Sequence, residues 1–287
     1  MKEKSLGSRI GKAIVACLIM LAIALASELL GELFVDPWAK SGSDAVYTFC
    51  KYLATIGTWI IVIAMGLIMP SRRGSLKRLS PRWPGNRPLT ALAGLLLGLA
   101  LNLIVAGIAM ASGSIHLTFA RFEPLWALLL LLAVLVQSGA EELLCRLFLM
   151  DELRKCFPKA PAIAVVGNGL VFTCLHLANP GISFWSCATL FLTALLLSLV
   201  VYCFDSLWAA ILIHTAWNYT QNILLGLPNS GHVMPYSIFV LTGEPASGFA
   251  YDPVFGLEGS PAAAIVIAIA CLVVFLLGRR KKAAQSA

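Results

Sequence analysis

About eight separate stretches of roughly 20 apolar residues recur along this chain of 287 residues. A helix rises about 1.5 Å per residue, so a run of this length crosses the roughly 30 Å hydrocarbon layer of a bilayer. Only 12% of the residues are charged, compared with about 25% in soluble domains. No alternation of apolar and polar residues indicates barrel strands. We therefore expect an all-α, polytopic transmembrane helix bundle, with residues 1–287 forming a single membrane domain. The expected spans are 13–35, 47–69, 88–112, 124–150, 161–178, 183–204, 206–225 and 261–278.

Lysine and arginine residues gather in four segments that fall on one side of an eight-span arrangement. These segments hold 17 of the 21 basic residues. Because cytoplasmic loops carry the excess of Lys and Arg, both termini are predicted to be cytoplasmic, in a multi-pass protein of the inner or plasma membrane. Membrane lipids are thus expected partners. The net charge of +7 follows from this topology and gives no reason to expect nucleic acid. The four segments are 2–12, 72–87, 154–159 and 279–282.

Three further features have ordinary explanations. The first apolar run and Ala24-Leu25-Ala26 resemble a signal peptide, but the run continues to Val35, so we expect an uncleaved span. The eight cysteines include no C-x-x-C pair and are expected to pack as small apolar residues. The long segment 226–260 is rich in Gly and Pro and cannot span the membrane. It fits either a cap over a site or a plain connector.

Two adjacent glutamates, Glu141 and Glu142, lie inside the fourth apolar run. An ionised side chain at the bilayer centre costs roughly 2.5–3.5 kcal/mol, so two of them need a polar cavity and partners. Arg146 follows Glu142 by four residues, which places both on one helix face. A structural ion pair would explain Glu142 and Arg146, but it would not explain the second carboxylate, Glu141.

Two of the four histidines lie inside later apolar runs, and each has a partner four residues away. The pairs are Phe172 with His176 and His214 with Asn218. Taken singly, each residue would be explained by packing or by an interhelical hydrogen bond, worth roughly 0.6 kcal/mol on average. Together with Glu141 they supply more polarity than helix adhesion needs.

Such a set of side chains is suited to activating water. A carboxylate acts as a general base, an imidazole relays a proton, ligates a metal or stabilises negative charge, and an amide donates to an oxyanion. No H-E-x-x-H sequence occurs, which excludes the ordinary zincin arrangement. The residues therefore outline peptide-bond hydrolysis without a serine or cysteine nucleophile.

Three motifs occur in a fixed order along these helices. Residues 141–146 read EExxxR, residues 172–176 read FxxxH and residues 214–218 read HxxxN. In this order they resemble the motifs of the CAAX-protease and bacteriocin-processing (CPBP) family, also called Abi or type II CAAX endopeptidases. The resemblance covers a core at about 124–222. It implies an all-helical intramembrane endopeptidase that cleaves membrane-associated or lipid-modified peptide or protein substrates.

The resemblance also implies a role for each motif residue. Glu141 would activate water, and His176 would assist the water or bind a metal. The family divides between glutamate-only and metal-dependent descriptions. A divalent metal such as zinc would be held by Glu141, His176 and His214, so the cofactor stays open. The implied catalytic set is Glu141, Glu142, His176, His214 and Asn218, with Arg146 and Phe172 in support.

Two other classes of function fit the same polar residues. One is a non-catalytic membrane partner or bacteriocin-immunity protein that binds a peptide in the same cavity. The other is a proton-coupled transporter, which predicts pseudo-symmetric halves with broken helices; the sequence has no such repeat. Substrate identity and oligomeric state stay open.

The expected depths of the motif residues disagree. Glu141 and His214 lie about 13 and 12 Å from the cytoplasmic ends of their spans, so the site is expected to open towards the cytoplasmic half of the bilayer. His176 instead falls near the external end of the span 161–178. Either the segment after Pro158 first runs along the membrane interface, which we favour, or the boundary is wrong.

Overall fold

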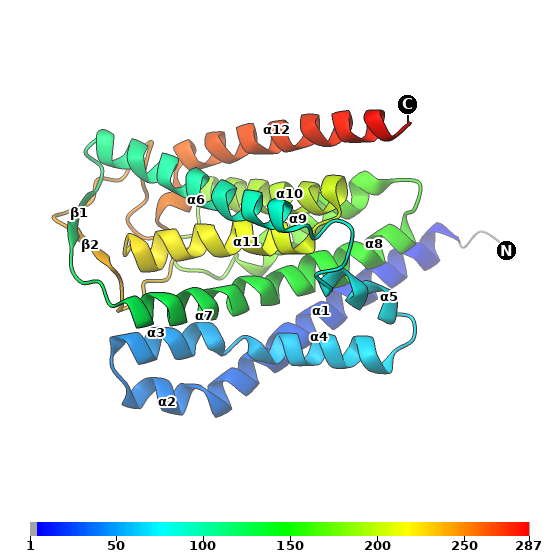
Figure 1. The fold of residues 1–287 in the computed structure, drawn as a ribbon, viewed down its shortest axis with the longest axis horizontal. Helices are drawn as coiled ribbons and strands as arrows, with labels where there is room; N and C mark the ends of the chain where they lie inside the picture. The colour runs from blue at the N-terminus through cyan, green and yellow to red at the C-terminus, as the bar shows by residue number, and fades with distance from the viewer. Residues whose placement is uncertain (1–4, 287) are drawn as a thin grey trace.

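The computed structural model describes residues 5–286, so Lys2 and Lys4 of the first basic segment lie outside the described residues. The chain folds into a bundle of long helices with a small sheet at one end (Figure 1). Helix α7 and its continuation α8 lie in the middle of the bundle, with α1 to α4 on one side and α6, α11 and α12 on the other. The elements are α1 (Leu6–Phe34), α2 (Asp36–Ser41), α3 (Asp44–Leu53), α4 (Ile56–Ile68), α5 (Arg73–Leu76), η1 (Lys77–Leu79), α6 (Pro88–Ala111), β1 (His116–Phe119), α7 (Pro124–Glu142), η2 (Leu143–Leu149), α8 (Met150–Cys156), α9 (Pro161–Leu175), α10 (Phe184–Phe204), α11 (Leu207–Asn218), η3 (Tyr219–Leu224), β2 (Phe239–Thr242), η4 (Leu257–Gly259) and α12 (Pro261–Ser286).

Six helical segments in the described chain are long and apolar enough to cross a membrane. One of them combines α3 and α4, and another runs without interruption from α7 to α8. Helix α9, with 15 residues, and α11, with 12, fall below this length although both lie within predicted spans. The expected multi-pass helical membrane protein is therefore confirmed. The count of eight spans and the orientation of the termini stay predictions.

The purely helical expectation needs one correction, because β1 and β2 form a two-stranded antiparallel sheet. His116 pairs with Thr242 and Phe119 pairs with Phe239. Each strand has only four residues, too few for a clear period-two pattern. The pairing also joins segments more than a hundred residues apart in the sequence, which a reading of local patterns does not detect. The sheet anchors the segment 226–260 to the connection between α6 and α7.

Helices α6 and α11 pack with their backbones in close contact. A Cβ atom on Gly98 would lie 2.2 Å from the carbonyl oxygen of Ile213, and one on Gly94 would lie 2.7 Å from that of Ala209. The spacing of four residues places both glycines on one face, the small-xxx-small arrangement of close membrane helices. This contact fixes the part of α11 that carries His214.

The helix bounds also remove the disagreement in depth. The fourth helix does not end at 150 but continues to Cys156, and α9 begins at Pro161. Fifteen residues separate Glu141 from Cys156, and fifteen separate Pro161 from His176, so both side chains lie about 22 Å from the turn between the helices. The fourth predicted span thus ended six residues before the end of its helix, whereas the predicted start of the fifth span at 161 coincides with the start of α9. The interfacial course of the segment after Pro158 stays a prediction.

Two ion pairs of Arg78, near the turn between α8 and α9, show that His214 of α11 lies at a depth similar to that of Glu141. Arg78 binds Asp151 at 2.8 Å and Asp205 at 3.1 Å, so the two carboxylates lie at a similar height. Glu141 precedes Asp151 by ten residues and His214 follows Asp205 by nine. Both therefore lie about 14 to 15 Å further into the bundle.

Candidate active site

The two adjacent glutamates have different surroundings. Glu142 is fully buried, and Arg146 Nη1 donates to its Oε1 atom at 2.9 Å. Arg146 Nη2 donates to the carbonyl oxygen of Ala194 at 3.0 Å, which ties the ion pair to α10. A buried charge needs a partner with good geometry, and Glu142 has one. It therefore lies beneath the site as part of its frame.

Glu141 is partly accessible, with 29% of its side chain exposed. Its Oε1 atom accepts a hydrogen bond from the Gln137 amide, one helical turn earlier. Its Oε2 atom lies 3.8 Å from Nε2 of His214. Of the two carboxylates, Glu141 is the one available to a water molecule.

His214 joins the two carboxylates. Its Nδ1 atom lies 3.0 Å from Oε1 of Glu142, and its Nε2 atom faces Glu141. An Nδ1–H group donating to Glu142 fixes the orientation of the ring and leaves Nε2 on the side of Glu141, as in other sites where one ring nitrogen is held so that the other can act.

The second motif forms a stack of rings. His176 is the C-cap of α9, and its Nδ1 atom lies 2.9 Å from the carbonyl oxygen of Phe172. The two rings are 4.6 Å apart, and the Arg146 guanidinium lies 5.1 Å from the Phe172 ring. Phe172 thus contacts both the cation of the first motif and the imidazole of the second. The spacing of four residues serves the stack and the hydrogen bond at once.

Asn218 belongs to a chain of amides that includes two residues sequence reasoning missed. Asn229 Nδ2 donates to Asn218 Oδ1 at 3.1 Å, and Asn218 Nδ2 donates to Gln137 Oε1 at 3.1 Å. Gln137 Nε2 then donates to Glu141. Gln137 had a local signal, because it is a polar residue in an apolar run, four positions before Glu141. Asn229 had none.

A third carboxylate, Glu258, also lies at the site and was not expected. It is 6% exposed and accepts hydrogen bonds from the Trp217 indole at 2.8 Å and from the backbone and hydroxyl groups of Ser230 at 2.8 and 2.7 Å. Burial raises the pKa of Glu258, while these hydrogen bonds and the charge of His176 act in the opposite direction. Through Glu258 and Asn229, the segment 226–260 is bonded to the helix of the third motif. Its contacts are those of a cap.

The motif residues meet in a cavity of about 580 Å³. Glu141, Phe172, His176, His214 and Asn218 line this cavity, together with Gln137 and Glu258. Glu142 and Arg146 are not among its lining residues. The cavity brings together all three motifs and separates the residues that reach a substrate from the pair that holds them.

Both helices that carry acidic or amide motif residues change geometry immediately afterwards. The π-helical turns η2 and η3 begin directly after Glu142 and Asn218. Such π-helical turns are rare in proteins as a whole, but those that occur are often found at functional sites. Here η2 begins inside the first motif and includes Arg146, whereas η3 begins directly after the third motif.

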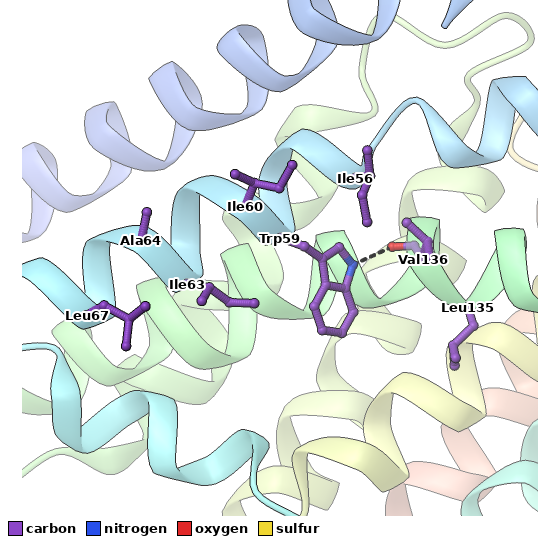
Figure 2. Close-up of a pocket in the computed structure, with 8 residues that line it drawn as sticks. All are labelled: Ile56, Trp59, Ile60, Ile63, Ala64, Leu67, Leu135 and Val136. Atoms are coloured by element: carbon purple, nitrogen blue, oxygen red, sulfur yellow. Dashed lines mark hydrogen bonds between the residues drawn. The ribbon is translucent and has the colours of Figure 1, made fainter.

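A second cavity of about 530 Å³ lies between α4 and α7 (Figure 2). Its walls are apolar, and the one polar group visible there, the Trp59 indole, donates to the carbonyl oxygen of Val136 at 2.8 Å. Ile60 and Leu67 on its wall are 63% and 62% exposed. This groove has the character of a lipid-facing surface.

The described residues do not present a three-ligand metal site. Within residues 5–286, no three His, Cys, Asp or Glu side chains cluster so as to hold a metal ion. The closest approach of His214 Nε2 and Glu141 Oε2 is 3.8 Å, and His176 Nδ1 is engaged by a backbone carbonyl. In this geometry Glu141, His176 and His214 do not fit the expected divalent metal.

The fold and the cavity together define a multi-pass helical membrane protein with a carboxylate–imidazole–amide site. Residues 123–220 match the family described as Type II CAAX prenyl endopeptidase Rce1-like, and the match includes all three motifs. No curated protein and no solved structure matches this chain. Over residues 123–220 this match confirms the resemblance to the CAAX-protease (CPBP) family. At the level of the family, this region is similar to a CAAX-type intramembrane endopeptidase domain.

Proposed function

We propose that this protein hydrolyses peptide bonds of membrane-associated or lipid-modified peptides or proteins, using a water molecule that Glu141 activates, with residues 124–222 as its catalytic core. One observation carries the proposal. Glu141 is a partly exposed carboxylate at the cavity wall, 3.8 Å from an imidazole that a second, buried carboxylate orients.

In the proposed reaction, Glu141 takes a proton from water as the water oxygen attacks the scissile carbonyl carbon. The tetrahedral intermediate carries the charge on the former carbonyl oxygen. There the imidazolium form of His214 donates through Nε2–H while its Nδ1–H stays on Glu142, and the second N–H of the Asn218 amide also donates. Glu141 then returns the proton to the leaving amine as the C–N bond breaks. His176 assists in placing the water, and Glu142 with Arg146 keeps His214 in position.

The test is cleavage of internally quenched peptides by the purified protein in detergent, with and without a chelator. The peptides include farnesylated Cys-aliphatic-aliphatic-X sequences and leader-type membrane peptides. Glu141→Ala is expected to lower kcat by about 10²–10⁴-fold, the usual contribution of a general base, while the protein still folds. Glu123→Ala, which removes an exposed glutamate at the other end of α7, is the matched control and is expected to keep full activity. An active Glu141→Ala variant would exclude the glutamate base, and a loss of activity with chelator would require a metal.

The same variants separate an enzyme from a peptide-binding protein. In an enzyme, the losses caused by Glu141→Ala, His176→Ala and His214→Ala are strongly non-additive, because the residues act as a unit on one water and one carbonyl. Peptide affinity then stays nearly unchanged. A binding protein forms no product, and each substitution weakens peptide affinity by its own increment.

A further inference from the structure

The two ends of the bundle differ in charge. The described residues of the four basic segments lie at the end where α1 begins, α8 passes into α9 and α12 ends (Figure 1). The opposite end carries the sheet and the segment 226–260. The sequence of this segment contains no lysine or arginine. The positive-inside rule predicts that this second end is the external one.

The cavity extends from the motif residues towards this second end. Besides the motif residues, its walls include Glu28 near the end of α1, Lys51 of α3, and Ser230 and His232 of the segment 226–260. Glu28 and His232 are exposed. None of the described residues of the four basic segments lines the cavity. These four polar residues, the lip of the cavity, therefore lie at the end of the bundle opposite the four basic segments.

The basic end of the bundle is closed by packing and ion pairs. Below the cavity, Leu147 and Phe148 are 2% and 4% exposed. The Arg72 guanidinium lies 4.2 Å from the Phe148 ring and forms an ion pair with Glu152 at 3.0 Å. Next to it, Arg78 clamps Asp151 and Asp205. A substrate approaching from this end would have to break these contacts.

We infer that substrate enters the cavity from the external face, so that the substrate is an exported or outer-leaflet peptide segment and not a cytoplasmic prenylated C-terminus. This inference rests on the proposed function and reverses the expectation that the site opens towards the cytoplasmic half. The access route is independent of the catalytic residues, because the lip residues are not part of the three motifs.

The experiment places single cysteines at the two ends and labels them with a membrane-impermeant maleimide. His232→Cys lies at the lip of the cavity, and Ser71→Cys lies at an exposed position directly before the basic segment 72–87. The wild-type protein, with its eight cysteines, gives the background. We expect His232→Cys to be labelled in intact cells and Ser71→Cys to be labelled only after permeabilisation.

The second arm measures cleavage in vesicles of known orientation. The probe is an internally quenched peptide with a single acyl anchor and several charged residues, added to one face only. We expect cleavage only when the external face receives the probe. A bulky maleimide on His232→Cys is expected to reduce its cleavage to the uncatalysed rate, compared with the same variant unlabelled, whereas labelled Ser71→Cys stays active.

The outcomes separate this inference from the proposed function. Labelling of Ser71→Cys from outside, or cleavage only of probe added to the cytoplasmic face, would overturn the inference. If His232→Cys is labelled from outside but no probe is cleaved on either face, the protease proposal fails while the direction of the cavity stands. Loss of probe cleavage in Glu141→Ala, with external labelling unchanged, supports both.

Discussion

Two cavities among the described residues have nearly equal volumes, about 580 Å³ at the three motifs and about 530 Å³ between α4 and α7. The first has carboxylates, imidazoles and amides among its lining residues, whereas the second is lined by aliphatic side chains and one tryptophan. Volume therefore does not mark the site in this protein. The site is marked instead by polar side chains that converge inside a membrane-spanning bundle, where burying polar groups costs free energy.

The physical difference lies in what supports each cavity. Around the polar cavity, the Glu142–Arg146 pair and the amide chain are held by contacts from α10, α11 and the segment 226–260. Around the groove, α4 packs on α7 through Trp59, with its indole satisfied by one carbonyl. Acyl chains can fill such a groove, whereas they cannot satisfy an ionised group.

The largest difference between the two regions is expected for Arg146→Ala. Removing one member of a buried ion pair leaves the other charge uncompensated, which typically costs about 3–5 kcal/mol. Folded yield and Tm in detergent should both fall, and activity should fall with them. Arg73→Ala, at an exposed arginine in the first basic loop, is the control and should leave Tm unchanged. An inactive Arg146→Ala protein with a normal Tm would instead make Arg146 part of the catalytic set.

A smaller effect is expected for Gln137→Met, which keeps the side-chain length but removes the hydrogen bonds that the amide forms with Glu141, Asn218 and Ser138. Glu141 then loses its amide donor, and Asn218 loses its acceptor. A hydrogen bond to a charged group is worth about 1.5–3 kcal/mol, so kcat should fall roughly 10- to 100-fold with little change in KM.

The matched control for Gln137→Met is Gln221→Met. Gln221 is a buried glutamine whose side chain accepts a hydrogen bond from Asn102 Nδ2 and donates one to the carbonyl oxygen of Pro228, and it does not line the cavity. The Gln221→Met variant should have a lower Tm, and the kcat of the folded protein should be unchanged. Equal losses of kcat in both variants would mean that Gln137 acts through general stability.

The smallest effect is expected in the apolar groove. Ile60 is 63% exposed there, and Ile60→Ala should change stability by no more than about 0.5 kcal/mol and leave peptide cleavage unchanged. Measurement of kcat and KM with the same quenched peptide checks this. A marked rise in KM would show that the groove holds part of the substrate and would end the contrast between the two cavities.

The sequence by itself determined the membrane class, the approximate helices and the three motifs. These rest on local rules: the length of an apolar run decides whether a helix can span the bilayer, and a spacing of four residues places two side chains on one helix face. The Glu142–Arg146 pair and the Phe172–His176 stack follow from that spacing, and both are present in the structure. Even so, the end of the fourth helix was misplaced by six residues, because the charged residues of 151–156 hid the continuation of α8.

Only the tertiary structure decided which glutamate faces the cavity, because two adjacent residues of a helix are distinguished by what packs around them. It also supplied Asn229 and Glu258, which lie 11 and 41 residues from their partners Asn218 and Trp217. The short strands and the direction of the cavity belong to the same category. Each depends on contacts between segments distant in the chain, and hydrophobic periodicity carries no information about which distant segments will meet.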